Sequence, residues 1–367
     1  MAIELSELEL ERSIARLAAE DIATHYVSFL GGGTYRHHSP AAVRRLAART
    51  LTAGGAAAYR ALRAELDDWN VSAAVLAGLP RVRPGIDPNR PALARGVAAA
   101  LAVRPRRRVG VSRALQPAHR ARLAAEAEAL RCELVELPVA VDGTTDLAAA
   151  GAGLDAIVVQ SPNVLGTFDL PTGADAERLA AAGVVVVVLV LEALALAVAD
   201  PSAAGAAVVV CEGRSFGLPL AFGGPRATFV ATSAELRDPG EPEEADGGHV
   251  AGAYLRLLGS GGLAAVADVS RARARALEER VTAAGFARRF SGATFNEAAF
   301  RVPAGWSAAA VLAALRRQTI VGGLDLGPWY PEYADCLLIA ATELATEREL
   351  AVLGDSLAAI ASEPPER

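Results

Sequence analysis

The sequence predicts an α/β protein with a mostly parallel sheet and a smaller C-terminal α+β unit. Short apolar runs alternate with amphipathic runs along the middle of the chain, a rhythm typical of parallel strands joined by crossover helices. Hydrophobic residues make up 52% of the 367 residues and aromatic residues only 5%, which favours helices packed closely on a sheet through Ala, Val and Leu. An acidic segment rich in Pro and Gly, at about 238–248, indicates a loop or boundary between the two units.

The elements of the large unit follow from their local patterns. Predicted strands lie at 108–112, 133–139, 156–160, within the valine run, at 206–212 and at 227–232, with helices at 117–131 and 174–182. The apolar run from Gly183 to Ala199 approaches the length of a membrane span, but it is shorter than about 20 residues and has Glu192 in its middle. A parallel strand buried on both faces explains this run better, because alternation disappears when both faces are covered.

Beyond the boundary the pattern predicts a compact α+β unit. A long Arg-rich amphipathic helix at about 261–284 precedes a short strand within 295–303, a helix at 307–317 and a terminal helix at about 346–361. The expected divisions are an N-terminal helical segment at 1–60, a large α/β domain at 61–245 and a C-terminal α+β domain at 246–367.

Composition limits the partners and the compartment. The net charge is −6, so we expect no nucleic-acid partner. The N-terminus is a charged amphipathic stretch without the apolar region of a signal peptide, which favours a cytoplasmic protein with no membrane association. Cys132, Cys211 and Cys336 lie far apart without CxxC spacing, so we expect buried, reduced thiols.

The chain contains no lysine, because all 36 residues counted as Lys or Arg are arginine. Compositional drift explains such a depletion of lysine, but whatever its cause, the chain has no lysine amine for a Schiff base. Since the arginine side chain stays protonated in proteins, it cannot act as an amine nucleophile or form a Schiff base.

Several motifs occur in the order and at the separations of a known family. They are FLGGGTYRHHSP, GVSRALQPAHRARL, VVQSPNVLGTFDL, VVVCEGRSFGLPLAFGGP, TFNEAAFRVP and LLIAATELATEREL. Together they cover most of the chain, which resembles glycine dehydrogenase (decarboxylating) subunit 1, the N-terminal half of the glycine-cleavage P-protein, as a shortened and diverged member. The resemblance implies the fold of type I pyridoxal-phosphate enzymes, related to aspartate aminotransferase. It also implies a similar second half that carries the cofactor lysine.

The motif EGRSFGLPLAFGGP locates the position of that lysine. In the catalytic half the matching turn resembles HKTF followed by PHGGGGP, with the spacing of Pro219 to Pro225 here. Five residues before Pro219, Arg214 stands at the position that the resemblance assigns to the lysine. An arginine there can hold an anion or pair with an acid, but it cannot carry the cofactor. Alternatively, the glycines of this motif only shape a tight turn.

The chain also departs from the family pattern. TLTAGGAAAYRALRAELDDWN replaces a TPYQPE-like segment, GLPRVRPGIDPNRPALARG replaces a YDGATA-like turn, and no basic stretch like EQHIRREKATSNI stands near DPGEPEEADGG. In a type I fold the second of these turns opens a helix whose free N–H groups could receive a phosphate. Because proline removes N–H donors, we expect this phosphate cradle to be lost.

Candidate residues that line a site or an interface are Gly31, Gly33, Tyr35, His38, Arg113, Asn163, Glu212, Arg214, Ser215 and Asn296. The N-terminal candidates are the glycine run at 31–33 with Tyr35, His37 and His38, although such a run is a weak phosphate signal and more often a flexible turn. His25, His37 and His38 have no carboxylate or cysteine at ligand spacing, so we expect no metal site. No catalytic residue is expected in this chain.

Alternatives stay open for several of these residues. Asn163 follows a parallel strand, where ligands bind, but it could equally cap a turn. Arg113 is a phosphate or carboxylate contact, or a partner for a neighbouring acid. The pairs Asn296–Glu297 and Thr342–Glu343 are expected to organise the C-terminal domain.

Two classes of function fit the sequence. The first is a non-catalytic subunit of a heteromeric, pyridoxal-phosphate-dependent glycine-decarboxylase-like enzyme. The resemblance then implies that the cofactor lies on a lysine-bearing second P-protein subunit or homologue, with none held covalently here, and that a lipoyl or other carrier protein is a further partner. The second is a pseudoenzyme that serves as a scaffold or binding protein. The missing lysine excludes a transaminase that acts alone.

Overall fold

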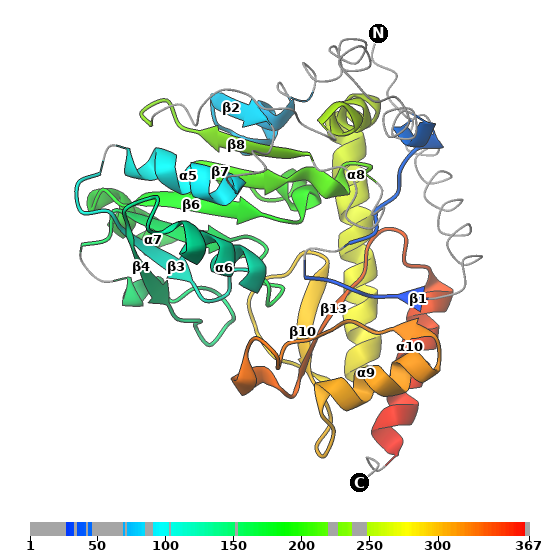
Figure 1. Ribbon diagram of the computed structural model, residues 1–367. Coiled ribbons are helices and arrows are strands. Elements are labelled where there is room, and N and C mark those ends of the chain that lie inside the picture. Colours follow the sequence, from blue (N-terminus) through cyan, green and yellow to red (C-terminus); the bar gives the residue numbers. More distant parts are fainter. Residues whose placement is uncertain are drawn as a thin grey trace.

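The computed structural model describes residues 27–32, 35–41, 43–45, 69, 72–84, 91–102, 104–150, 153–218, 227–236 and 248–363. Within these ranges a large α/β unit and a smaller C-terminal unit lie side by side, and the long α8 (Gly248–Ala283) runs along both (Figure 1). Predictions for 1–26, Gly33, 85–90, Pro219–Pro225 and 238–247 fall outside the described residues.

The large sheet is mostly parallel, as predicted. Within the described residues it has seven strands in the order β2-β8-β7-β6-β5-β3-β4. They are β2 (Arg81–Pro84), β3 (Arg108–Ser112), β4 (Glu133–Leu137), β5 (Ala156–Gln160), β6 (Val185–Val190), β7 (Ala206–Glu212) and β8 (Thr228–Thr232). Strands β3 to β7 pair in parallel, whereas β8 pairs antiparallel with both β7 and β2.

The valine run forms the centre of this sheet. All six residues of β6 are buried, because β6 lies between the parallel strands β5 and β7 and is covered on both faces. After β6 the chain makes the 3-10 turn η2 (Ala193–Ala197), and Glu192 caps it by accepting a hydrogen bond from the backbone N–H of Leu194. The apolar run is therefore a strand followed by a turn, and its single acidic residue sits where the strand ends.

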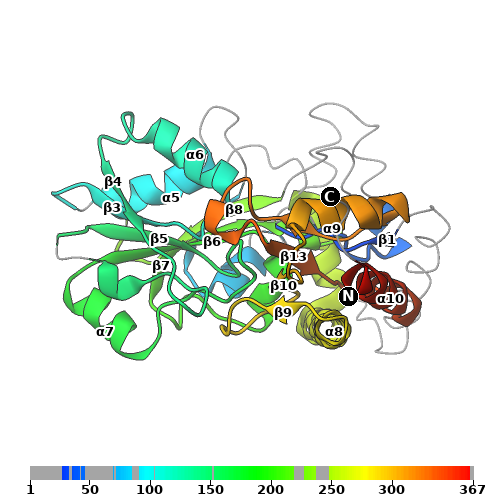
Figure 2. The same ribbon diagram turned by 90° about the horizontal axis from the view of Figure 1, so that it is seen from below.

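Helices cover both faces of the large sheet. Helices α5 (Ala92–Leu101) and α6 (Pro117–Glu126) lie on one face, and α7 (Gly173–Ala181) lies on the other (Figure 2). Helix α6 is shorter than the predicted 117–131, because the chain turns after Glu126 and Arg131 has a φ of 50°. Cys132 precedes the edge strand β4 and is only partly buried, so the expectation of a buried thiol is wrong there, whereas Cys211 and Cys336 are buried.

The C-terminal unit contains an antiparallel sheet in the order β12-β13-β10-β9. Its strands are β9 (Ala287–Arg288), β10 (Glu297–Arg301), β12 (Leu324–Asp325) and β13 (Cys336–Ala340), packed with α9 (Ala308–Arg317) and α10 (Glu347–Ser362). The N-terminal segment joins this unit, since β1 (Val27–Ser28) pairs in parallel with β11 (Ile320–Val321). Figure 1 shows β1 beside α9 and α10 and apart from β2, β3 and β4 of the large sheet.

Among the described helices, α8 is the one long and apolar enough to cross a membrane. It is not a continuous helix, because Gly259 (φ 64°, ψ −176°) interrupts it, and half of its most apolar window is buried inside the protein. Val250, Tyr254 and Val266 of α8 pack in the core of the large unit. A core helix of a soluble protein passes the same test of length and composition, so α8 is only a weak indication of a membrane span.

Candidate functional site

Buried polar side chains gather where β6 and β7 end against the C-terminal unit. We call this group the junction cluster; it consists of Tyr35, His37, His38, Glu192, Asn296, Glu297 and Glu343. The carboxyl ends of parallel strands are the usual place for ligands in α/β folds. Here that place is shared by the N-terminal segment, the large unit and the C-terminal unit.

His37 connects two carboxylates from different units. Its Nε2 lies 2.9 Å from Oε2 of Glu192, and its Nδ1 lies 2.9 Å from Oε2 of Glu343. All three side chains are at most 3% exposed. Burial by itself would lower the pKa of His37, but the two carboxylates outweigh it and raise this pKa to about 10. The imidazole is therefore a buried cation between two anions.

Glu343 is held in its charged form. Burial would raise its pKa, but the His37 cation and hydrogen bonds from His37 and His38 hold the pKa of Glu343 well below its usual range. The backbone N–H of His38 donates to Oε1 at 2.6 Å, and the Ser270 hydroxyl donates to Oε2 at 2.9 Å. Ser270 lies on α8, so this carboxylate joins the N-terminal segment to both the long helix and the end of β13.

Glu192 collects donors from three parts of the chain. The Ser215 hydroxyl, directly after β7, donates to Oε1 at 2.6 Å. The Asn296 side-chain amide donates to Oε2 at 3.0 Å from the C-terminal unit, and His37 contacts the same oxygen. Both carboxylate oxygens are thus bonded to protein donors, and the end of β6 is already occupied by groups of this chain.

Among the described residues, Glu297 has only neutral hydrogen-bond partners. Tyr35 donates its hydroxyl proton to Oε1 at 2.6 Å, and the backbone N–H of Gly32 donates to Oε2 at 2.8 Å. Burial outweighs these donors, and together with the negative charge of Glu192 it raises the pKa of Glu297 to about 7. A Cβ at Gly31 would overlap Oε2 of Glu297, and Gly32 has a φ of +69°. The glycine run therefore lets the backbone approach a carboxylate of the same chain.

Some hydrogen-bonding capacity inside the junction remains unused. Within the described residues, neither ring nitrogen of His38, nor Oδ1 of Asn296, nor the hydroxyl of Tyr254 makes a hydrogen bond, although Nδ1 of His38 lies 3.5 Å from Oε1 of Glu343. The rings of His38 and Tyr254 lie 5.6 Å apart between centroids, and both side chains are completely buried. Burial and the neighbouring Glu343 and Glu192 raise the pKa of Tyr254 well above its usual value. Its hydroxyl therefore stays protonated.

Glu212 and Arg214 form a second, more exposed group at the end of β7. Nε of Arg214 lies 3.7 Å from one carboxylate oxygen of Glu212, and Nε2 of His119 lies 3.5 Å from the other. These side chains are 17% to 28% exposed. A cavity of about 40 Å³ lies beside them, lined by Pro91, Ala92, Leu93, His119, Arg122, Leu189, Val210, Glu212 and Thr228.

Two predicted candidates have their partners elsewhere. The Arg113 guanidinium lies 2.6 Å from Glu332 and 5.8 Å from the ring centre of Tyr330, so it pairs with a neighbouring acid. Oδ1 of Asn163 accepts hydrogen bonds from the backbone N–H groups of Leu165 and Thr167, so this residue caps the turn after β5. Both residues thus have the protein partners that the structural alternative requires, and a role toward a ligand stays a prediction.

Sequence reasoning missed the centre of the junction cluster. It names His37 among the N-terminal candidates without giving it a partner, and in the described residues no group of His, Cys, Asp and Glu could hold a metal ion. The expectation that Asn296 and Glu343 organise the C-terminal domain is too narrow, because Asn296 binds Glu192 of the large unit and Glu343 binds His37. Glu192 is the residue that indicates such a cluster from the sequence, because a charge within an apolar strand run needs a buried partner.

Comparison with known proteins decides the family. Residues 1–240 match the family model described as glycine cleavage system P-protein. The chain belongs to the glycine cleavage system P-protein family. It is 32% identical over 391 residues to a protein of Anaeromyxobacter dehalogenans named "Probable glycine dehydrogenase (decarboxylating) subunit 1", which covers 92% of this chain and 86% of that protein. A protein of the same name from Geotalea daltonii is 29% identical over 403 residues, 97% of this chain and 90% of the relative.

Solved structures give the same result for the P-protein fold. The crystal structure of glycine decarboxylase (P-protein) of the glycine cleavage system, in inhibitor-bound form, matches with a TM-score of 0.79 and 30% identity over 98% of this chain and 91% of that chain. A cysteine desulfurase from Escherichia coli matches with a TM-score of 0.69 at 14% identity, over 94% of this chain and 97% of that chain, and shows the fold alone. The predicted family and the type I pyridoxal-phosphate-enzyme fold are confirmed.

Proposed function

We propose that this P-protein family member is a non-catalytic subunit of a heteromeric, pyridoxal-phosphate-dependent glycine-decarboxylase-like enzyme. A separate subunit with the cofactor lysine completes the enzyme. The observation that carries this proposal is the absence of any lysine from the 367 residues. The similarity to proteins named subunit 1 supports it, because such a name implies a second subunit.

Three features at the end of β7 argue against a cofactor site in this chain. Arg214 stands at the position assigned to the lysine, and the adjacent cavity of about 40 Å³ is far smaller than the roughly 300–1,000 Å³ usual for small-molecule and cofactor sites. The Glu212 carboxylate lines this cavity together with His119 and Arg122, and it is the group among these three that disfavours a phosphate. Pro91 at the N-cap of α5 makes no side-chain cap bond and contributes no N–H. We therefore propose that pyridoxal phosphate is held by the partner and not by this chain.

The junction cluster supports a structural role for this chain. Glu192 at the end of β6 binds His37, Ser215 and Asn296, so the crevice that such folds use for a ligand holds protein side chains instead. We propose that the cluster fixes the N-terminal segment against both units, so that the chain presents one defined surface to its partner. A lipoyl or other carrier protein is a further proposed partner, and the cytoplasm is the proposed compartment.

The test is co-expression with a lysine-bearing second P-protein subunit. We expect a defined hetero-oligomer that decarboxylates glycine, whereas this chain alone self-associates, stays colourless with pyridoxal phosphate and has no activity. After borohydride reduction, mass spectrometry should find the cofactor only on the partner. A control partner in which the cofactor lysine is replaced by alanine should still assemble but remain inactive.

Two outcomes would reject the proposal in different ways. Covalent cofactor on this chain, or glycine decarboxylation by this chain alone, would show that it is catalytic. A well-behaved monomer that ignores the lysine-bearing subunit would instead favour the pseudoenzyme scaffold, in which the P-protein fold is kept for binding alone.

A further inference from the structure

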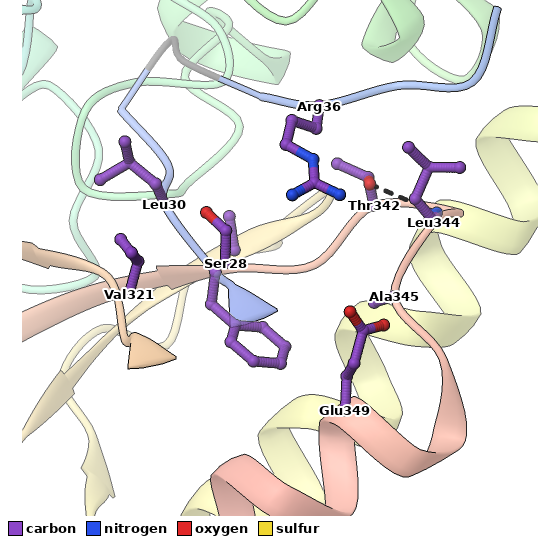
Figure 3. Close-up of a pocket in the computed structure, with 10 residues that line it drawn as sticks. Ser28, Leu30, Arg36, Val321, Thr342, Leu344, Ala345 and Glu349 are labelled. Carbon is purple, nitrogen blue, oxygen red and sulfur yellow. Dashed lines mark hydrogen bonds between the residues drawn. The ribbon is translucent and has the colours of Figure 1, made fainter. Parts of the chain in front are cut away.

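The N-terminal segment borders both the junction cluster and open space. A cavity of about 330 Å³ lies between β1, the end of β13 and the first turn of α10 (Figure 3). Leu30 and Arg36 line this cavity from the N-terminal segment. Two other residues of the same segment, Gly32 and Tyr35, bind Glu297 of the cluster. The segment is therefore packed at some residues and has room beside it at others.

Two carboxylates hold this segment, and they suit opposite charge states. Glu343 binds the His37 cation, which keeps it charged. Glu297 accepts the Tyr35 hydroxyl at 2.6 Å and the Gly32 N–H at 2.8 Å, and none of the groups that shift its pKa is a cation. Because Glu297 is buried with neutral donors, its protonated form is the one that suits its surroundings.

The groups around Glu297 come from several elements. Tyr35 faces it from the N-terminal segment, and the negative charge of Glu192 acts on it from the end of β6. Opposite Glu297 on β13 stands the apolar Ala340, and Gly166 after β5 lies against its backbone. An ionised Glu297 would thus be a buried anion near another anion.

The two cations of the segment are directed elsewhere. His37 is held between Glu192 and Glu343, at 2.9 Å from an oxygen of each. The Arg36 guanidinium points into the cavity (Figure 3), and in the described part of the chain it forms no ion pair with Glu297. Water is therefore the group that can stabilise an ionised Glu297.

The backbone of the segment covers this carboxylate. A Cβ at Gly31 would overlap Oε2 of Glu297, and the Gly32 N–H donates to the same oxygen. Water can reach Oε2 only when this backbone moves, and the adjoining cavity leaves room for the movement. We propose that the contacts of Gly32 and Tyr35 with Glu297 form a pH-sensitive latch, which opens locally when Glu297 releases its proton to water. The latch lies within this chain and needs no cofactor or partner.

The direction of the switch follows from the proton affinities of its two states. In the closed latch the pKa of Glu297 is about 7, and in the open latch water returns it toward its ordinary value of 4.5. Opening should therefore become about tenfold more favourable from pH 6 to pH 8. Over this range His37 stays charged, because its pKa is about 10. The anchor at Glu343 therefore holds while the latch opens.

Hydrogen exchange of the full chain, resolved to single amides and corrected for the intrinsic exchange rate, tests the latch. We expect the protection of the Gly32 N–H to fall about tenfold from pH 6 to pH 8. The His38 N–H, which donates to Glu343, should stay at least about tenfold better protected than Gly32 at both pH values. An amide in the centre of β6, Val187, reports global unfolding and should be better protected than both.

Three variants separate a latch from a passive contact. Glu297→Gln cannot ionise, so the corrected protection of Gly32 should change by less than about twofold over the same range. Tyr35→Phe should move the fall in protection to higher pH, because the lost hydroxyl had favoured the charged carboxylate. The matched control is Glu212→Gln, a carboxylate at the end of β7 outside the cluster, which should keep the tenfold fall of the wild type.

Several results would overturn the proposal. Protection of Gly32 equal to that of Val187 would show global unfolding without a local latch. Protection of Gly32 that does not depend on pH in the wild type, or a tenfold fall that persists in Glu297→Gln, would remove the role of this carboxylate. If Glu297→Gln fails to fold, Tyr35→Phe decides, since an unshifted pH profile would reject the latch.

Discussion

Glu343 and Glu297 are equally buried, each 2% exposed, and belong to the same cluster. Burial disfavours the charge of both, yet the pKa of Glu343 falls well below its usual range and the pKa of Glu297 rises to about 7. The difference lies in the partners. Glu343 meets the His37 cation, whereas Glu297 meets only the hydroxyl of Tyr35 and one backbone N–H. A neighbouring cation, and not the degree of burial, thus decides which carboxylate is charged.

The two carboxylates lose their contributions to stability at opposite ends of the pH scale. The lowered pKa of Glu343 contributes stability that is present above its unfolded value of about 4.5 and is lost as pH falls through its folded pKa. The raised pKa of Glu297 contributes stability that is present below about 4.5 and is lost as pH rises through about 7. The raised pKa of His37 contributes stability present below 6.5 and lost as pH rises through about 10. On the alkaline side, Glu297 should therefore weaken first.

Replacing His37 gives the largest expected effect. His37→Ala leaves Glu192 and Glu343 buried without their cation, and we expect a loss of about 3–5 kcal/mol in the free energy of unfolding, measured by urea denaturation. The control is His119→Ala, beside the partly exposed Glu212, which should cost less than about 1 kcal/mol. Equal, small losses in the two variants would remove the distinction between a buried and an exposed acid–histidine pair.

Glu297→Gln tests the carboxylate whose hydrogen-bond partners are neutral. Between pH 5 and pH 8 the wild-type chain should lose on the order of 2 kcal/mol of stability through Glu297, because the folded state resists its ionisation. Glutamine keeps the acceptor for Tyr35 but cannot ionise, so the variant should lose correspondingly less over the same range. The measurement is the unfolding free energy at both pH values. Parallel pH profiles for the variant and the wild type would contradict the raised pKa of Glu297.

Gly31→Ala tests the close approach of the backbone to the Glu297 carboxylate. The added Cβ would overlap Oε2 of Glu297, and displacing that carboxylate should cost about 1–3 kcal/mol. A Cβ added at Gly261 in α8 would have nothing within 4 Å, so Gly261→Ala should be neutral or stabilising by up to about 1 kcal/mol. Thermal unfolding of both variants distinguishes close approach to a carboxylate from general intolerance of glycine replacement.

Arg214→Lys gives the smallest expected effect. It restores an amine at the end of β7, but the cavity of about 40 Å³ and the Glu212 carboxylate remain. We expect at most weak, dialysable cofactor binding, no decarboxylation and a stability change within about 0.5 kcal/mol. Visible absorbance after dialysis and mass spectrometry after borohydride reduction provide the measurement. Tight binding with turnover would show that the phosphate site is intact after all.

The sequence contained more about the fold than about the site. Helices and strands follow from local patterns, so the all-valine centre of β6 and the alternation around it were enough for the parallel sheet. The junction cluster depends on which distant residues meet. The sequence separation between His37 and Glu192 is 155 residues, and that between His37 and Glu343 is 306. No local pattern contains that pairing, although a glutamate inside an apolar run shows that some buried cation must exist.

The His37 contacts also set an order of assembly. During synthesis the N-terminal segment emerges early, but one of its two carboxylate partners is 306 residues further along the chain. Closing so long a loop is slow because its entropy must be paid before the contact forms. A nascent chain that has not yet reached Glu343 leaves His37 without half of its counter-charge. β1 and the segment that carries His37 should therefore dock last, after both units have formed around the place that they will occupy.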